Sequence, residues 1–518
     1  MRLVHNLPGM QLVCLLAAGV EGVEGFPVTV EVHRDSPSFG TGRTSIVGLP
    51  DAAVREGMER VLPAVMASGL AHRPTDHVVV NLAPADRRKE GAAFDLAIAL
   101  GLTATMEENG LPALGDDLGL LAELALDGRL RPVRGVLAMA VALRDAGVQR
   151  LAVAPENAAE AAVVAGLDVR APRDLRALVE GLRGAWTDLP RPPAAAPTTQ
   201  ADEHADLSDV RGQDHAKRAL MICAAGGHNL LMIGPPGSGK TMLARRLPGL
   251  LPPMTDPESL EVTRIHSVAG LLDHGAGLVR RRPFRAPHHS VSAVGLIGGG
   301  PYPRPGEVSL AHHGVLFLDE LPEYPRPVLE SLRQPLEDGH LTISRSAARL
   351  DFPSRCMLVA AMNPCPCGWL GHPTRACTDN QEAVHRYRRR ISGPLLDRID
   401  LHLEVPAQKP QALDAPASGP DSATVRERVL AARQRMLERQ RRANAALDGR
   451  GVRQHCRPDD AGMALLHQAV EELGLSARAH DRILKVARTI ADLDGHEKAG
   501  LEQVSEAIGY RLLDRQTW

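Results

Sequence analysis

The stretch that decides the fold is Asn229-Leu-Leu-Met-Ile233 followed by Gly234-Pro-Pro-Gly-Ser-Gly-Lys-Thr241. It reads as a short apolar strand, a G-x-x-x-x-G-K-[ST] loop and then a helical pattern from Met242 to Leu247. This is the strand–loop–helix context that a P-loop requires, in which backbone N–H groups and a helix N-terminus bind phosphates. We expect Lys240 to reach the β- and γ-phosphates and the Thr241 hydroxyl to bind Mg²⁺. The predicted nucleotide-binding residues of the loop are Gly234, Pro235, Pro236, Gly237, Ser238, Gly239, Lys240 and Thr241.

Two later apolar runs supply the acids and the amide that such a site needs. Gly314-Val-Leu-Phe-Leu-Asp-Glu320 is a strand that ends in two carboxylates. Asp319 is expected to bind Mg²⁺ with the nucleotide, and Glu320 to polarise the attacking water as a general base. Met357-Leu-Val-Ala-Ala-Met362 is a third strand, and Asn363 at its end is expected to orient that water. A solvated acidic pair and a turn asparagine are the plainer interpretations.

Taken in this order, the three strands resemble the AAA+ ATPases, and longer motifs narrow the resemblance. They are Arg285-Ala-Pro-His-His-Ser290, Gly306-Glu-Val-Ser-Leu-Ala-His-His313, Asn363-Pro-Cys-Pro-Cys-Gly368, Ser392-Gly-Pro-Leu-Leu-Asp-Arg-Ile-Asp400 and Ser476-Ala-Arg-Ala-His-Asp-Arg-Ile-Leu-Lys-Val-Ala-Arg-Thr-Ile-Ala491. The chain resembles the magnesium-chelatase-like AAA+ family of bacterial YifB/ComM proteins over nearly its whole length. The resemblance implies ATP and Mg²⁺ as cofactors.

Two arginines receive roles from this resemblance. Arg398 matches the arginine finger that acts on the ATP of a neighbouring subunit, and Arg478 matches the sensor-2 arginine of the helical lid. Both are therefore predicted to be catalytic, together with Glu320 and Asn363. A finger that acts in trans implies a homo-oligomer, by analogy a hexameric ring promoted by ATP or DNA. Without the family, a surface ion pair is the simpler interpretation of each arginine.

Two segments occupy the places where related ring motors carry pore hairpins. Residues 280–300 include His288 and His289, and residues 341–352 read as a hairpin with Arg345 and Arg349 beside its turn. Cations that line a pore would bind DNA phosphates without reading sequence. We therefore predict His288, His289, Arg345 and Arg349 as DNA-binding residues. The alternative is that they are solvated loop charges.

Composition shifts divide the chain into domains. The clearest boundary is the stretch Leu189-Pro-Arg-Pro-Pro-Ala-Ala-Ala-Pro-Thr-Thr-Gln200, which has the composition of a stiff linker. The predicted fold class is α/β: an AAA+ P-loop αβα core with a C-terminal helical lid, preceded by a Lon-protease-like (S5-type) domain. The predicted domains are a Lon-like domain (1–188), a linker (189–206), the ATPase core with its hairpin inserts (207–406), a linker with a basic connector helix (407–456) and the lid (457–518).

The resemblance of the N-terminal region to Lon-type proteases does not extend to their catalytic dyad. Alignment by eye places Ala93 at the serine position and Leu137 at the lysine position. Neither side chain can act as nucleophile or base, so we do not expect peptidase activity. A collar for assembly or DNA contact and a purely structural domain are the two remaining interpretations.

Length and composition limit the function classes. The chain has 518 residues, 44% hydrophobic, with a net charge of −2, which excludes a histone-like polycation but not a local basic groove. Aromatic residues make up 3%, too few for stacked base-binding platforms. No apolar run approaches the ~18 residues of a membrane span. The seven cysteines lack the spacing of a disulfide scaffold, which favours the reducing cytoplasm.

A cysteine cluster invites a zinc interpretation. Cys365, Cys367 and Cys377 have C-x-C-x₉-C spacing, which is tighter than the usual C-x₂₋₄-C knuckle and lacks a fourth thiolate. His372 and Asp379 are the two candidates for a fourth ligand. Reduced, locally packed thiols are the favoured interpretation, and structural zinc is the alternative.

The function predicted from these features is an ATP-hydrolysing ring motor on DNA. As the family resemblance implies, it would be a helicase or translocase that promotes branch migration in homologous recombination and natural transformation. The alternative is a protein-remodelling or chelatase-like ATPase that does not act on DNA. A Lon-like protease is disfavoured by Ala93 and Leu137.

Overall fold

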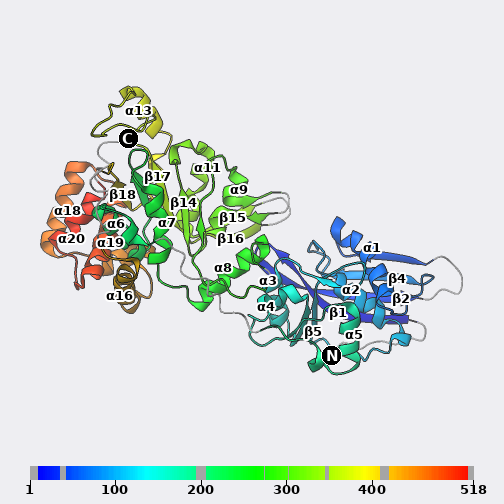
Figure 1. Ribbon diagram of the computed structural model, residues 1–518. Helices are drawn as coiled ribbons and strands as arrows, with labels where there is room; N and C mark the ends of the chain where they lie inside the picture. Colours follow the sequence, from blue (N-terminus) through cyan, green and yellow to red (C-terminus); the bar gives the residue numbers. More distant parts are fainter. Residues whose placement is uncertain are drawn as a thin grey trace. The chain divides into compact units, whose positions relative to one another are not determined.

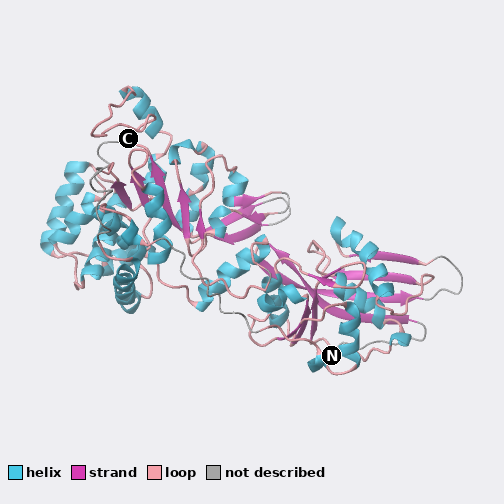
Figure 2. Ribbon diagram, viewed as in Figure 1, coloured by secondary structure: helices cyan, strands magenta, loops and turns pink. Residues whose placement is uncertain are grey.

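The computed structural model describes residues 10–35, 42–193, 206–273, 275–300, 303–344, 349–408 and 419–511. Contacts divide the chain into two compact units, Met1–Thr199 with Ser259–Val279, and Gln200–Glu258 with Arg280–Trp518. Each unit contains both helices and strands (Figure 2). No helix among these described residues is both long enough and apolar enough to cross a membrane.

The second unit is built on a five-stranded sheet in the order β11-β14-β17-β10-β18, of which Figure 1 labels β14, β17 and β18. Every neighbouring pair is parallel. All residues of β10, β14 and β17 are buried, because helices cover both faces of such a sheet, and this is why these strands are continuous apolar runs. The strands are β10 (Leu230–Ile233), β11 (Phe284–Arg285), β14 (Val315–Leu318), β17 (Met357–Met362) and β18 (Leu401–Glu404).

Short helices and two small hairpins surround this sheet. The hairpins are β12 (Gly298–Gly299) with β13 (Arg304–Pro305), and β15 (His340–Ser344) with β16 (Arg349–Pro353). The helices are η4 (Leu207–Asp209), α6 (Asp214–Gly226), α7 (Lys240–Leu250), α9 (Ala293–Ile297), α10 (Glu307–Leu310), η5 (Leu321–Glu323), α11 (Arg326–Ser331), α12 (Arg333–Asp338), α13 (Gln381–Arg388) and α14 (Gly393–Leu396).

The C-terminal part of the second unit is helical. Its helices are α16 (Ser422–Gln440), η6 (Asn444–Ala446), α17 (Gly449–His455), α18 (Asp460–Leu473), α19 (Ala477–Asp494) and α20 (Leu501–Gly509). Helix α19 contacts α6, α16 and α20, and one buried cluster runs from Leu230 and Met232 of the sheet to Val429, Ile483 and Ile490 of these helices. The helical region and the sheet therefore share a hydrophobic core.

The first unit contains a mixed seven-stranded sheet in the order β3-β4-β2-β1-β5-β8-β9. The long strands β1 (Met10–Glu21) and β2 (Glu24–Asp35) pair antiparallel, and β5, β8 and β9 continue parallel to β1. The other elements are β3 (Arg43–Val47), α1 (Ala52–Ala67), β4 (His77–Ala83), α2 (Asp95–Ala104), η1 (Glu107–Asn109), β5 (Leu118–Leu121), β6 (Glu123–Leu124), β7 (Leu130–Arg131), α3 (Val136–Asp145), β8 (Arg150–Val153), η2 (Pro155–Asn157), α4 (Ala158–Ala161), β9 (Asp168–Arg170), α5 (Leu175–Arg183) and η3 (Trp186–Asp188).

One segment groups differently from the sequence-based division. Residues 259–279 lie within the predicted ATPase core of 207–406, but they pack with the first unit. They include most of α8 (Asp256–Ala269), whose Leu260 packs on the apolar cluster around α3. Ser267 donates a hydrogen bond to the buried Glu160 carboxylate, and its carbonyl accepts from the Gly135 N–H at 3.2 Å. An insertion after the P-loop helix thus supplies packing surface to the N-terminal unit.

The two positions aligned with the Lon dyad lie in the same apolar cluster. Ala93 and Leu137 are both buried there, among side chains such as Ala18 and Met139. The Leu137 N–H donates to Glu160 at 2.8 Å, as part of the packing around α3.

A buried carboxylate ties the end of the sheet to the C-terminal helices. Asp400 is 3% exposed and forms an ion pair with Arg482 of α19, while the Asn229 N–H donates to it at 2.9 Å. The His228 Nδ1 lies 3.5 Å from the same carboxylate. Burial by itself would raise the pKa of Asp400, but Arg482, His228 and the Asn229 N–H together hold that pKa well below its usual range.

We expect Asp400→Asn to destabilise the second unit. Removing one charge of a buried pair costs about 3–5 kcal/mol because its partner is left uncompensated. Because the folded-state pKa lies below the unfolded value of about 3.9, this stabilisation is present above that pH and is lost as the pH falls toward the folded-state pKa. Urea denaturation should show a lower midpoint at neutral pH, and the difference from the parent should shrink below about pH 4.

The matched control is Asp481→Asn, since Asp481 is half exposed and pairs only with the adjacent His480 among the described ion pairs. Its midpoint should match the parent. Equal midpoints for Asp400→Asn and the parent would show that the Asp400 pair does not stabilise the fold.

Candidate functional site

The P-loop joins the buried strand β10 to helix α7, as the motif predicts. Gly237 and Gly239 have φ values of 75° and 92°, in the left-handed region that favours glycine. A Cβ on Gly234 would lie 2.1 Å from the Val405 carbonyl oxygen, so only glycine fits there. The Ser238 hydroxyl is buried and has no hydrogen-bond partner among the described residues. The loop is therefore closely packed against the sheet, with helix α7 beginning at Lys240.

The predicted phosphate-binding lysine and the predicted water-orienting asparagine lie together. Lys240 is 8% exposed, and its Nζ donates to the carbonyl oxygens of Gly234 at 2.6 Å and Pro235 at 3.0 Å. The same Nζ lies 3.4 Å from Asn363 Oδ1. Burial lowers the pKa of Lys240, while Asp319 and Glu320 oppose that shift.

The two predicted Mg²⁺ ligands also meet. The Thr241 hydroxyl donates to Asp319 Oδ2 at 2.7 Å, and the Asp319 Oδ1 accepts from the Glu320 N–H at 3.0 Å. Mg²⁺ binds hydroxyl, carboxylate and water oxygens at its ligand positions. This donor set, at the N-terminus of α7, fits a magnesium ion held together with nucleotide phosphates.

Glu320 adopts a backbone conformation that few non-glycine residues use. Its φ is 52°, and such strain is typical of functional positions. The His289 Nδ1 lies 3.3 Å from the Glu320 carboxylate, and the His289 ring makes an edge contact with Tyr324 at 6.4 Å between centroids. The Tyr324 hydroxyl in turn donates to the Pro287 carbonyl at 2.6 Å, which holds the histidine segment against this site.

Sequence reasoning missed the neighbour of the predicted general base. The sequence predicts His289 as a DNA-binding residue, yet the structure places it beside Glu320. His288 is exposed, with its ring 4.0 Å from that of His289 and its Nδ1 2.8 Å from the Ser290 hydroxyl. No spacing rule links residues so far apart in sequence, so only the tertiary structure brings them together.

Comparisons with known proteins agree with this architecture. Residues 206–413 match the family described as "Magnesium chelatase, subunit ChlI", residues 419–511 its C-terminal family, and residues 30–157 "Subunit ChlI of Mg-chelatase". The chain is 45% identical to "Uncharacterized protein YifB" of Escherichia coli, over 95% of this chain and 96% of that protein. It is 44% identical to "Competence protein ComM" of Haemophilus influenzae, over 98% of each chain. The chain belongs to the magnesium-chelatase-like YifB/ComM family.

A more distant similarity covers only part of this YifB/ComM chain. The chain is 25% identical to "Magnesium-chelatase 67 kDa subunit" of Heliobacterium mobile, over 40% of this chain and 34% of that protein. The predicted family and fold class are confirmed, because the family matches coincide with a parallel α/β sheet and a C-terminal helical region. The roles of single residues remain predictions.

The two arginines predicted from the YifB/ComM resemblance both lower the pKa of one carboxylate, that of Glu337. Arg398 is 6% exposed, pairs with Glu337 at the end of α12, and donates to the Pro394 carbonyl at 2.7 Å. Arg478 is exposed in the first turn of α19. The hydrogen bond from Arg398 and the charges of Arg398 and Arg478 hold the pKa of Glu337 below its usual value, against a smaller opposing effect of burial.

One of the two hairpin arginines lies in the described residues. Strands β15 and β16 pair antiparallel from His340↔Pro353 to Ser344↔Arg349, which confirms the hairpin. Arg349 is the first residue of β16 and is exposed. Arg345 lies outside the described residues. Leu341 and Phe352 are buried at the base of the hairpin and anchor it.

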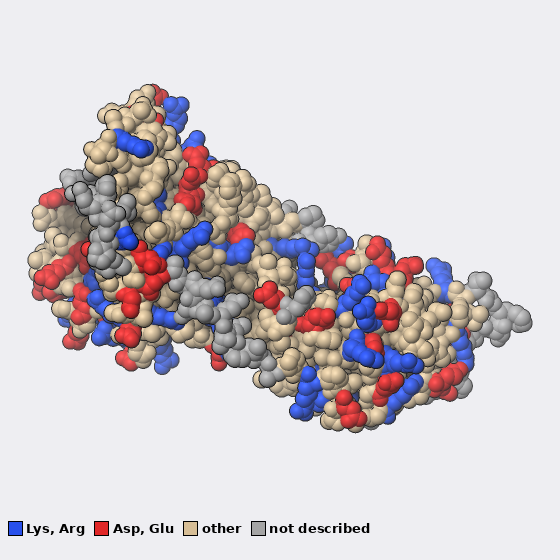
Figure 3. All heavy atoms as spheres, viewed as in Figure 1, with Lys and Arg blue, Asp and Glu red and all other residues tan. Residues whose placement is uncertain are grey.

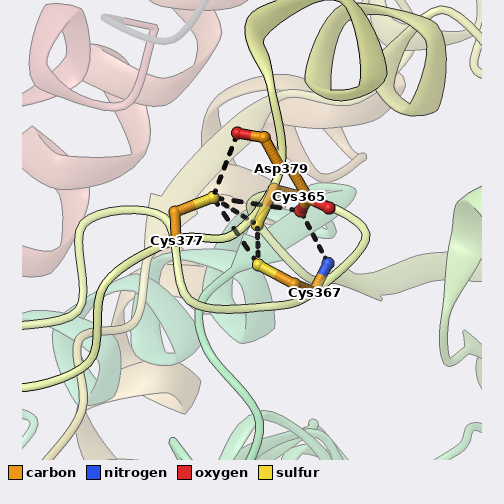
Figure 4. A group of neighbouring side chains, drawn as sticks. All are labelled: Cys365, Cys367, Cys377 and Asp379. Carbon is orange, nitrogen blue, oxygen red and sulfur yellow. Dashed lines mark hydrogen bonds between the residues drawn. The ribbon is translucent and has the colours of Figure 1, made fainter.

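The cysteine motif of this YifB/ComM chain forms a compact cluster (Figure 4). The Cys365 Sγ lies 3.4 Å from that of Cys367 and 3.6 Å from that of Cys377, and the last two lie 3.5 Å apart. Asp379 joins them, whereas His372 packs edge-on against Trp369, 5.1 Å away between ring centroids. Of the two candidate fourth ligands, the structure brings Asp379 to the thiols.

We expect Lys240→Ala and Glu320→Gln to separate ATP binding from hydrolysis. Lys240→Ala removes the charge that faces the phosphates and should abolish tight ATP binding in a fluorescent-nucleotide titration. Glu320→Gln leaves the binding residues in place and should bind ATP but turn over about 10²–10⁴-fold more slowly. The control is Glu323→Gln, whose carboxylate pairs with Arg390 at 2.8 Å, and which should turn over like the parent. Equal turnover of Glu320→Gln and the parent would remove Glu320 from its predicted role.

We expect Arg398→Ala to lose turnover while still binding ATP. A finger that acts on a neighbour's phosphate contributes about 10³–10⁵-fold to hydrolysis. Mixing Arg398→Ala with Lys240→Ala subunits should partly restore turnover, because each supplies what the other lacks. Arg333→Ala is the control, since Arg333, the first residue of α12, pairs with Glu330 of α11 at 3.1 Å. No rescue at any mixing ratio would argue against action in trans.

Proposed function

We propose that this chain is an ATP-hydrolysing ring motor that acts on DNA, a helicase or translocase promoting branch migration in homologous recombination and natural transformation. The observation that supports ATP hydrolysis is that two pairs of side chains from different segments come into contact at the P-loop. Thr241 contacts Asp319 at 2.7 Å and Lys240 contacts Asn363 at 3.4 Å, although each pair is far apart in sequence. Their convergence supports hydrolysis of ATP with Mg²⁺.

Each group at this site has a distinct task in the proposed reaction. Lys240 would neutralise the β- and γ-phosphates, and Thr241 and Asp319 would hold a magnesium ion, which supplies positive charge to the nucleotide phosphates when bound. Glu320 accepts a proton from the attacking water as that water adds to the γ-phosphorus and the bond from this phosphorus to the β,γ-bridging oxygen breaks, with ADP as the leaving group. Asn363 orients the water from the neighbouring strand end. His289, 3.3 Å from Glu320, holds that carboxylate in place before ATP and water arrive.

A ring follows from the proposed role of Arg398. A guanidinium supplied to a neighbour's γ-phosphate requires a head-to-tail contact between subunits, and the resemblance favours its closure into a hexamer. Within one chain Arg398 is paired with Glu337, whose own side chain is half exposed. Assembly would therefore exchange an intramolecular ion pair for a contact with the adjacent subunit's nucleotide. The exposed Arg478 is proposed to sense the nucleotide of its own subunit.

DNA is proposed as the substrate because of the hairpin and the relatives. Arg349 is exposed at the end of the β15–β16 hairpin, and Arg345 follows β15 directly in sequence. Basic and acidic side chains are interspersed on the face drawn in Figure 3, and the net charge is −2. DNA phosphates would therefore have to bind to a local group of basic side chains rather than to a broad basic surface. One relative with 44% identity is named a competence protein, which supports a role in processing incoming DNA.

The test is steady-state ATP hydrolysis by the full chain, alone and with single-stranded, duplex or branched DNA, with Lys240→Ala as the blank. We expect several-fold stimulation by DNA. Turnover indifferent to every DNA would instead favour the alternative, a protein-remodelling or chelatase-like ATPase, for which the partial similarity to a magnesium-chelatase subunit is the supporting observation.

A second measurement locates the surface that binds DNA. Replacing Arg345 and Arg349 together with alanine should weaken DNA binding and reduce the slope of log K against log salt by about 0.9 for each phosphate that the protein no longer neutralises. Arg173→Ala is the control, since its side chain is 84% exposed and pairs with the adjacent Asp174. An unchanged salt slope in the double variant would place the DNA on another surface.

A further inference from the structure

The loop that follows β17 has almost no regular structure to hold it. Between the end of β17 at Met362 and the start of α13 at Gln381, the described backbone forms only turns and bends. Loops of this length in a compact domain need their own source of order. This loop carries Cys365, Cys367, Cys377 and Asp379, whose ligand atoms all lie within 4.8 Å of one another.

The sulfur positions fit metal coordination better than any covalent link. The three Sγ–Sγ distances are 3.4, 3.6 and 3.5 Å, whereas a disulfide is about 2.05 Å long and joins only two sulfurs. Three thiolates around a tetrahedral zinc ion, each about 2.3 Å from the metal, lie about 3.8 Å from one another. The observed triangle is thus close to one face of such a tetrahedron.

Asp379 supplies a fourth donor atom beside the triangle of sulfurs. Its Oδ2 lies 3.9 Å from the Cys377 Sγ and accepts a hydrogen bond from the Cys367 N–H at 2.7 Å (Figure 4). Zinc takes carboxylate oxygens at about 2.0–2.2 Å. The Asp379 oxygen would therefore need to move only slightly toward a zinc ion bound by the three sulfurs. The His372 Nδ1 instead accepts from the backbone N–H groups of Thr374 at 3.2 Å and Arg375 at 3.1 Å, and its ring packs on Trp369.

We propose that Cys365, Cys367, Cys377 and Asp379 bind one structural zinc ion. The geometry reverses the preference for metal-free packed thiols that the spacing alone supported. Soft thiolate ligands select zinc over magnesium, and four protein ligands leave no open position for catalysis. Cys365 is buried while Cys367 and Cys377 are partly exposed, so the ion reaches the site from solvent.

The zinc-bound loop would brace the nucleotide site. A Cβ on Gly368, which follows Cys367, would lie 2.7 Å from the Cδ of Pro236, so the turn packs directly on the P-loop. The Arg388 Nε of α13 donates to the Pro364 carbonyl of this loop at 3.2 Å. Asn363, the first residue of this loop, contacts Lys240. The metal therefore fixes the loop that positions Asn363.

The first test is the metal content of the purified full-length protein, measured by mass spectrometry of the metals. We expect about one zinc ion per chain in the parent, and a loss of at least about tenfold in Cys367→Ser and Cys377→Ser. Cys14→Ser and Cys356→Ser are the matched controls, since both thiols lie outside the cluster, and they should keep their zinc. A parent that holds no zinc after growth and purification with added zinc overturns the proposal, as does full zinc in a Cys367→Ser, Cys377→Ser double variant. These results do not depend on ATP or DNA, so they stand apart from the proposed motor function.

The second test keeps the proposal falsifiable if the serine variants fail to fold. Co²⁺ replaces zinc in the parent and in Asp379→Cys and Asp379→Asn, and the visible spectrum of each is recorded. The parent should show the intense bands of tetrahedral cobalt bound to thiolates. Asp379→Cys should keep these bands and strengthen the sulfur-to-cobalt absorption, because a fourth thiolate is added, whereas Asp379→Asn should bind cobalt more weakly. Octahedral cobalt spectra in the parent overturn the site, and identical spectra and affinities in all three proteins overturn the assignment of Asp379.

Discussion

The parallel pairing of β10 with a strand on each side is the constraint on which the rest of the second unit depends. Leu230–Ile233 pairs in register with Val359–Met362 on one side and with Leu401–Glu404 on the other. All three strands therefore end at the same edge of the sheet. The P-loop leaves β10 there, Asn363 leaves β17, and the Gly234 backbone packs against the Val405 carbonyl. A register shift by one residue would exchange the two faces of β10 and separate these groups.

Helix α7 also contacts the end of a strand that is not hydrogen-bonded to β10. Strand β14 pairs with β17, and Asp319 follows its last residue. Thr241, in the first turn of α7, spans the gap with its 2.7 Å hydrogen bond to Asp319. Glu320 comes next in a strained conformation, which directs its side chain toward His289. The site is thus assembled from strand ends by one helix.

Contacts at the opposite end of β10 fix the backbone of Arg398, the predicted arginine finger. The Asn229 side-chain N–H donates to the Arg398 carbonyl at 3.0 Å, and the Asn229 backbone N–H donates to Asp400. Asp400 pairs with Arg482 of α19. The backbone around Arg398 is therefore tied to both the P-loop strand and the C-terminal helices. The buried carboxylate thus links the segment that carries Arg398 to α19.

The sequence by itself determined the parts that depend on local pattern. Local pattern predicts the P-loop, the two strands that end just before Asp319 and Asn363, and the β15–β16 hairpin. Continuous apolar runs indicate buried strands, and a glycine-rich turn between a strand and a helix indicates a phosphate-binding loop, because both depend on residues close together in sequence. Only the tertiary structure placed His289 beside Glu320, paired Arg398 with Glu337, moved residues 259–279 to the N-terminal unit and chose Asp379 over His372. These outcomes depend on distances between segments that are remote in sequence, or on how one loop folds on itself. Spacing rules contain no such information, because packing and the pairing of buried charge decide it.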